Sequence, residues 1–181
     1  MREVPDRQQS SRVSLPRWMA PILGLFVWLV AIPLGHGALP WAISLLAPRH
    51  GWVTGHPGGW NFIGLIPVVV GIALLIWIMV LGLAQTSELP ERVRLDWTPK
   101  FLLRCGPYAF TRNPMYLAEL GLWLGWAIFY VSAGVLGGFL VLCVVVNFVV
   151  RREERDLEAQ FSEVYLEYKR KVPRWLGKTQ R

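Results

Sequence analysis

Residues 60–84 form an unbroken stretch without a single charged side chain. A helix of roughly 20 apolar residues, each rising 1.5 Å, crosses the hydrocarbon core of a bilayer. Asp, Glu, Lys and Arg make up 17% of the chain, against about 25% in an average soluble domain. The charged residues gather between long apolar segments. The sequence therefore predicts an all-α, polytopic membrane protein forming one domain over residues 1–181.

Four transmembrane helices are predicted. The first covers residues 18–47 and has a possible break at 35–37, so that residues 38–47 either extend a tilted helix or lie at the membrane interface. We expect this segment to be retained, because no small-x-small cleavage site follows it cleanly. The second helix covers residues 60–84. Residues 114–150 contain two apolar arms separated by only three residues, which predicts an antiparallel helical hairpin.

The distribution of Lys and Arg predicts the orientation of these helices. The N-terminal tail, the three connecting segments and the C-terminal tail carry 4, 1, 5, 0 and 9 basic residues in turn. Segments rich in Lys and Arg stay in the cytoplasm. Both termini and residues 85–112 are therefore predicted to be cytoplasmic, in the inner membrane if the protein is bacterial.

The C-terminal segment, residues 151–174, is predicted to form a cytoplasmic amphipathic helix that ends at Pro173. Its apolar residues recur at steps of three and four and form one stripe: Leu157, Phe161, Val164, Tyr165, Tyr168 and Val172. An alternative is a helix that lies on the membrane surface, held by its basic residues to anionic lipid.

Several classes of site are not indicated. There is no Gly-rich phosphate loop, nucleophile elbow or metal-spaced His/Cys cluster, so no metal is expected. The basic charge follows the loops between membrane segments, which gives no reason to expect nucleic acid. The three histidines, His36, His50 and His56, are predicted to be surface residues near the non-cytoplasmic side.

Two polar blocks, residues 100–116 and 151–174, flank the predicted hairpin. Because a hairpin returns its end beside its start, Arg112 and Asn113 are expected close to residues 151–154. Arg and Glu side chains next to a membrane also often pair only with each other and with lipid headgroups. For polar blocks without a specific motif, that purely structural role stays an alternative.

These blocks carry specific motifs. Gly106-Pro107-Tyr108 precedes Arg112-Asn113-Pro114-Met115-Tyr116, and after the hairpin come Glu153-Glu154, the apolar stripe and Val172-Pro173-Arg174. This pattern resembles the isoprenylcysteine carboxyl methyltransferases and the wider group that includes membrane phospholipid N-methyltransferases. The resemblance covers roughly residues 98–176. Ser162 stands where the family has Gly, and Val149 where eukaryotic members have a substrate-contacting Arg.

The resemblance implies that S-adenosylmethionine is bound at the cytoplasmic side. Carried over residue by residue, the cofactor contacts are Lys100, Phe101, Leu102, Leu103, Tyr108, Asn113, Pro114, Met115, Tyr116 and Glu153. Glu153 suits the ammonium group of the cofactor, and a tyrosine suits its sulfonium. Arg112 and Arg152 are predicted catalytic residues that guide an anionic acceptor.

The predicted function is methyl transfer from S-adenosylmethionine to an acceptor that is dissolved in the membrane. The predicted partners are this lipophilic acceptor, which enters from the bilayer, and the surrounding membrane lipids. The carboxylate of a prenylated cysteine or a similar lipophilic acid is favoured because it needs no general base. A phospholipid amine is the alternative acceptor. An NADPH-dependent membrane reductase and a non-catalytic membrane module are the other classes considered.

Glu119 is the one acidic residue inside an apolar segment. An ionisable group at such a position has a functional or paired role by default. From its depth in the predicted hairpin, Glu119 is expected to hydrogen-bond to Asn147.

The predicted topology can be tested by labelling single engineered cysteines from outside intact cells. Sites at Ser87 and Thr179 should remain unlabelled because they are predicted to be cytoplasmic, whereas a site at Thr54 should react. Labelling at Ser87 would contradict the four-helix topology.

Overall fold

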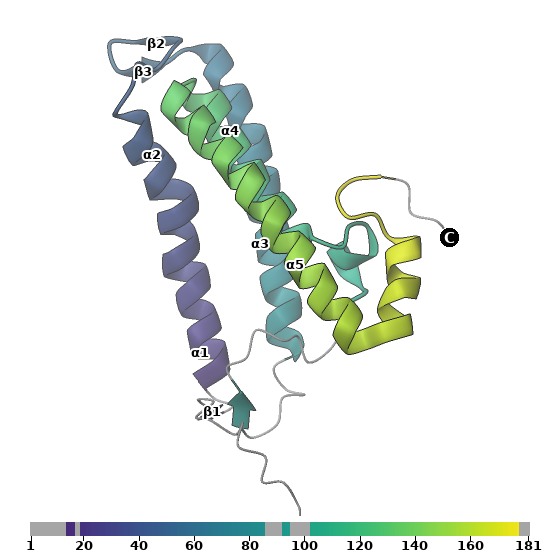
Figure 1. The fold of residues 1–181 in the computed structure, drawn as a ribbon. Coiled ribbons are helices and arrows are strands. Elements are labelled where there is room, and N and C mark those ends of the chain that lie inside the picture. The colour runs from purple at the N-terminus through teal and green to yellow at the C-terminus, as the bar shows by residue number, and fades with distance from the viewer. Residues whose placement is uncertain (1–13, 17–18, 86–91, 95–101, 178–181) are drawn as a thin grey trace, which may run out of the picture.

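The computed structural model describes residues 14–16, 19–85, 92–94 and 102–177, and it is mostly helical (Figure 1). Three helical stretches in this part of the chain are long and apolar enough to cross a membrane: Ile22–Ser44, Gly59–Ala84 and Ala133–Lys171. The chain is therefore an integral membrane protein by length and composition. The predicted cofactor contacts Lys100 and Phe101 lie outside the described residues.

The first helix is continuous although its sequence contains prolines and glycines. α1 (Met19–Phe26), η1 (Val27–Ala31), η2 (Leu34–Ala38) and α2 (Leu39–Ser44) follow one another as one rod (Figure 1). η1 and η2 are π-helical turns, which are rare and occur mostly as bulges inside α-helices, frequently at functional sites. Residues 35–37 therefore widen the helix without breaking it, and α2 extends it.

The second and third helices make the closest packing. η3 (Gly59–Gly64) leads into α3 (Leu65–Gln85), which runs along α4 (Pro114–Tyr130). A Cβ atom added at Gly64 would lie 2.4 Å from the carbonyl oxygen of Gly125, so the two backbones touch. Small residues at such contacts let membrane helices approach each other closely. Val68, Leu75, Ala118 and Leu122 complete this interface as a buried cluster.

A short loop covers one end of the bundle. β2 (Trp52–Val53) and β3 (His56–Pro57) pair as a tight hairpin whose turn residues Thr54 and Gly55 both have positive φ. The indole of Trp52 donates a hydrogen bond to the Phe129 carbonyl and stacks on Tyr130 near the end of α4. At the other end, β1 (Ser14–Pro16) pairs antiparallel with β4 (Arg92–Arg94).

Two residues, Val131 and Ser132, separate α4 from α5 (Ala133–Lys171), which turns back beside α4 (Figure 1). α4 has 17 residues, which is at the lower limit for a membrane crossing, so a fourth span stays a prediction. α5 continues without interruption from its apolar half into the predicted cytoplasmic segment.

The helix direction changes sharply at Ser162, which has φ 45° and ψ −123°. This region is strained for any residue with a Cβ and suits glycine, the residue that the resemblance described above implies at this position. Beyond it the last part of α5 folds back on the protein (Figure 1). The predicted single helix over 151–174 is thus replaced by two segments with a bend.

The apolar stripe of this segment packs against protein. Tyr165, Tyr168 and Val172 form a buried cluster with Leu102, Leu157 and Phe161. Val164 faces outward and is exposed. The stripe therefore fastens the C-terminal segment to the residues that precede α4.

The contact between α3 and α4 predicts a position-specific effect of adding one methyl group. Gly125→Ala places its Cβ 2.5 Å from a Val68 methyl and 2.6 Å from the Gly64 carbonyl, and overpacking of this kind costs about 1–3 kcal/mol. Gly121→Ala in the same helix meets nothing closer than 3.6 Å. Thermal unfolding in detergent should show a lower Tm for Gly125→Ala alone; equal Tm values for the two variants would contradict this packing.

Candidate active site

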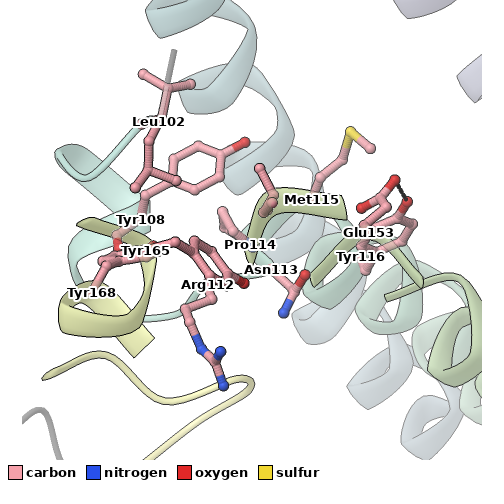
Figure 2. Close-up of a pocket in the computed structure, with 12 residues that line it drawn as sticks. Leu102, Tyr108, Arg112, Asn113, Pro114, Met115, Tyr116, Glu153, Tyr165 and Tyr168 are labelled. Atoms are coloured by element: carbon pink, nitrogen blue, oxygen red, sulfur yellow. Dashed lines mark hydrogen bonds between the residues drawn. The ribbon is translucent and has the colours of Figure 1, made fainter. Parts of the chain in front are cut away.

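A cavity of about 180 Å³ lies where the polar segments meet, between η5 (Gly106–Ala109), the start of α4 and the polar part of α5 (Figure 2). Its walls are mainly aromatic and aliphatic, with a few polar groups. The lining residues are Leu102, Leu103, Tyr108, Arg112, Asn113, Pro114, Met115, Tyr116, Glu153, Leu157, Tyr165 and Tyr168.

The structure brings most of the predicted site residues together. All eight predicted cofactor contacts within the described residues line this cavity, as does Arg112. Arg152 is exposed and does not line it. Leu157, Tyr165 and Tyr168 also form its wall, although the sequence predicted for them only a place in the apolar stripe. Their spacing alone did not indicate which surface they would cover.

Glu153 is held at the cavity by a tyrosine from the other arm. The hydroxyl of Tyr116, in the first turn of α4, donates a 2.7 Å hydrogen bond to Glu153 Oε1 (Figure 2). Tyr108 lies on the opposite wall, where burial and then the negative charge of Glu153 raise the pKa of its hydroxyl. Tyr108 is therefore neutral at physiological pH. A carboxylate beside neutral aromatic rings is an arrangement that binds cations.

Glu154 has a different role from its neighbour. Its side chain is buried, and Arg174 donates hydrogen bonds to it from Nε at 3.0 Å and Nη2 at 2.6 Å. Arg112 Nη1 lies 3.2 Å from Glu154 Oε1. Burial would raise the pKa of this carboxyl, but the bonds from Arg174 and the charge of Arg112 hold it below its ordinary value. Glu154 is an ionised anchor for two arginines.

Arg112, which was predicted to guide an anionic acceptor, has an ion-pair partner in the structure, and its role toward an acceptor stays a prediction. Its guanidinium points away from Tyr108 and Glu153 (Figure 2) and is already paired with Glu154. Glu154 is shared with Arg174, so this one carboxylate faces the positive charges of two arginines. The sequence predicted that Arg112 would lie close to residues 151–154, and the structure pairs it with Glu154 of that segment.

Backbone bonds fasten the same region. Arg112 N–H donates to the Pro173 carbonyl at 3.0 Å, and the Thr111 hydroxyl donates to the Arg174 carbonyl at 2.9 Å. The side-chain amide of Asn113 donates to the Arg174 carbonyl at 3.2 Å. We call the contacts of residues 111–113 and Glu154 with residues 173–174 the C-terminal clasp. Asn113 thus contributes to the clasp as well as to the cavity wall.

A second polar group lies inside the helical bundle. Glu119 makes no hydrogen bond with Asn147 in the described structure; instead its Oε1 lies 4.0 Å from His36 Nε2 on the first helix. The indole of Trp123 donates to His36 Nδ1 at 3.1 Å, and Trp126 donates to the His36 carbonyl. His36 is therefore half-buried between helices and is not a surface residue like His50 and His56. No cluster of three metal-ligating side chains occurs among the described residues.

Comparison with known proteins indicates the family to which the chain belongs. The model of the phospholipid methyltransferase family matches residues 60–164, more than half of the chain. The chain belongs to this family. It is also 38% identical over 63 residues to an uncharacterized protein of Haemophilus influenzae, covering 34% of this chain and 100% of that protein. No solved structure matches significantly. The family assignment supports a membrane methyltransferase and leaves the acceptor open.

The C-terminal clasp can be tested by removing one arginine. Arg174→Ala eliminates the hydrogen bonds from Nε and Nη2 to Glu154, and lost bonds to a charged group cost roughly 1.5–3 kcal/mol. Thermal unfolding should therefore show a marked decrease in Tm. Arg170→Ala, at an exposed position in the same segment, is the control and should leave the Tm nearly unchanged. Equal effects of the two changes would contradict a stabilising clasp.

Proposed function

We propose that this protein transfers a methyl group from S-adenosylmethionine to an acceptor dissolved in the membrane. The observation that carries the proposal is the cavity in which Glu153, fixed by Tyr116, faces the aromatic side chain of Tyr108. The family assignment supports the reaction class.

The residues present fit such a cofactor. Glu153 supplies an anionic acceptor for an ammonium group, and Tyr108 a neutral ring for a sulfonium. Leu102, Leu103 and Leu157 supply apolar surface for a flat base. When bound, the cofactor supplies the electrophilic methyl group.

The protein's contribution to the reaction is mainly positioning. Displacement of a methyl group requires the reacting atoms at about 3–3.5 Å in a line, and fixing that geometry removes much of the barrier. The bond between Tyr116 and Glu153 joins α4 to α5 at the cavity. This hydrogen bond therefore fixes the position of the cavity wall that an acceptor would pass.

Two acceptors remain candidates. A prenylated cysteine carboxylate, or a similar lipophilic acid, is ionised at neutral pH and needs no base; the exposed Arg151 and Arg152 beside Glu153 could attract it. A phospholipid amine carries the opposite charge and suits the carboxylates near the cavity. The two acceptors give chemically distinct products, a base-labile ester and a stable methylamine.

The cofactor assignment predicts the effect of two small changes. Glu153→Gln removes the charge, and Tyr116→Phe removes the hydroxyl that holds it. The loss of one hydrogen bond to a charged group, worth roughly 1.5–3 kcal/mol, should weaken S-adenosylmethionine binding about tenfold or more. Calorimetric titration in detergent measures the change, with the exposed Glu163→Gln as the control.

An unchanged affinity in both variants would remove this site assignment. Titration with NADPH separates the reductase alternative, because a reductase would bind NADPH in place of S-adenosylmethionine. A chain that binds neither molecule would be a non-catalytic membrane module.

A further inference from the structure

Three apolar residues beside the C-terminal clasp are left uncovered by the described protein. Phe110 is 64% exposed and Leu176 is 76% exposed, and the side chain of Trp175 is partly exposed. We call Phe110, Trp175 and Leu176 the rim patch. Large apolar side chains that gather on a surface mark a contact with a partner or a membrane.

The clasp brings the two parts of the rim patch together. The hydrogen bonds from residues 111–112 to the carbonyls of residues 173–174 join the two segments in opposite directions. The next residues in this register are Phe110 on one segment and Trp175 on the other. Val172 is buried against the protein, which fixes the position of the chain just before the clasp. The rim patch is therefore one surface formed by two segments.

Arg174 marks the level of this surface relative to the membrane. Its carbonyl accepts a 3.2 Å hydrogen bond from the side chain of Asn113, the residue directly before α4. Its guanidinium binds Glu154, which lies about one helical turn beyond Val150 on α5. Val150 is the last residue of the apolar half of that helix. Arg174 thus lies where the apolar parts of α4 and α5 end.

The length of the returning segment agrees with this level. Residues 151–162 carry α5 away from its apolar half by about 18 Å, at 1.5 Å of rise per residue. After the bend at Ser162, residues 163–171 return as a helix over about 13.5 Å. Residues 172–176 then need to cover only a few ångströms more, and a non-helical chain spans up to about 3.3 Å per residue. Figure 1 shows this segment running back toward the apolar half of α5.

The charges near the rim patch suit a lipid headgroup. Arg104 is exposed just before η5, and Lys178 follows the patch in the sequence. Basic residues bind anionic headgroups, and Trp is enriched at the same depth. The outer face of the returning helix differs, because the exposed Glu163 and Glu167 lie there with Val164. That face suits water.

We infer that the rim patch inserts as one unit into the bilayer that the protein spans, at the boundary between headgroups and hydrocarbon. The occupant of this surface is lipid rather than a soluble partner or a second copy of the chain. Contact with lipid does not depend on the proposed methyl transfer, and it is measured without the cofactor.

Insertion of the rim patch determines where the candidate active site lies. Phe110 is two residues from Tyr108 and two from Arg112, which both line the cavity of that site. An anchor at Phe110 therefore holds this cavity at the membrane surface, where a molecule presents its polar end while its chain stays in lipid. A second, apolar cavity of about 350 Å³ lies between the first helix and the α3–α4 pair, and no residue of the rim patch lines it.

Spin labels measure the depth of the rim patch. Single cysteines replace Phe110 or Leu176 in a protein that carries Cys105→Ser and Cys143→Ala, and Val164→Cys is the matched control at another exposed apolar position. The protein is reconstituted in vesicles of phosphatidylcholine and phosphatidylglycerol. Power saturation compares collisions with oxygen, which concentrates in hydrocarbon, and with a nickel chelate, which stays in water. Labels at positions 110 and 176 should lie about 5–10 Å inside the headgroup boundary, and the label at 164 in water.

A charge placed in the rim patch tests whether its members insert together. Leu176→Glu should move the label at position 110 from lipid into water, because a charged side chain in hydrocarbon is costly. Val164→Glu should leave that label in lipid.

Three results would each overturn the inference. The first is equal exposure of the labels at 110, 176 and 164 to the nickel chelate. The second is a label at 110 that stays in lipid in the Leu176→Glu protein. The third is shielding of the labels at 110 and 176 from both reagents, and dipolar broadening would then identify a contact between two copies of the chain.

Discussion

The buried carboxylate of Glu154 holds two distant parts of the chain together, at the end of the bundle that is predicted to be cytoplasmic. It is bound by Arg174 from the C-terminal segment and by Arg112 from the residues before α4. Removing one partner from a buried ion pair typically costs about 3–5 kcal/mol, because the remaining charge is left uncompensated. The bend at Ser162 returns Tyr165 and Tyr168 to the same region. Without the C-terminal clasp, the cavity around Tyr108 would lose this wall.

Sequence reasoning located the site better than it assigned roles within it. The hairpin predicted that the two polar blocks meet, and the resemblance to a known family named Tyr108, Tyr116 and Glu153 within them; all three line one cavity. The hairpin predicted that Arg112 would lie near residues 151–154, but not that Glu154 would be its partner. The contacts of Thr111 and Asn113 with Arg174, about 60 residues further along the chain, were not predicted. Ser162 was marked only as a departure from glycine, and its positive φ gives the physical reason that glycine suits this position.

The position of Glu119 shows that the depth of a side chain in the membrane does not identify the residue it contacts. Depth along the hairpin predicted Asn147, but the face of α4 decides the contact. Ala118, Leu122 and Gly125 face α3, where the glycine contact fixes the rotation of the helix. Glu119 and Trp123, four residues apart, consequently face the first helix. The sequence of that helix contributed only hydropathy, so nothing in it distinguished His36 as the partner.

A membrane methyltransferase has to bring a charged, water-soluble cofactor to a molecule that stays in lipid. In this protein α4 borders both a polar and an apolar cavity. Its first turn borders the polar cavity through Tyr116, and its middle borders the apolar cavity through Leu122 and Trp126. Tyr116 and Leu122 are six residues apart, so a rise of about 9 Å along α4 separates the borders of the two cavities.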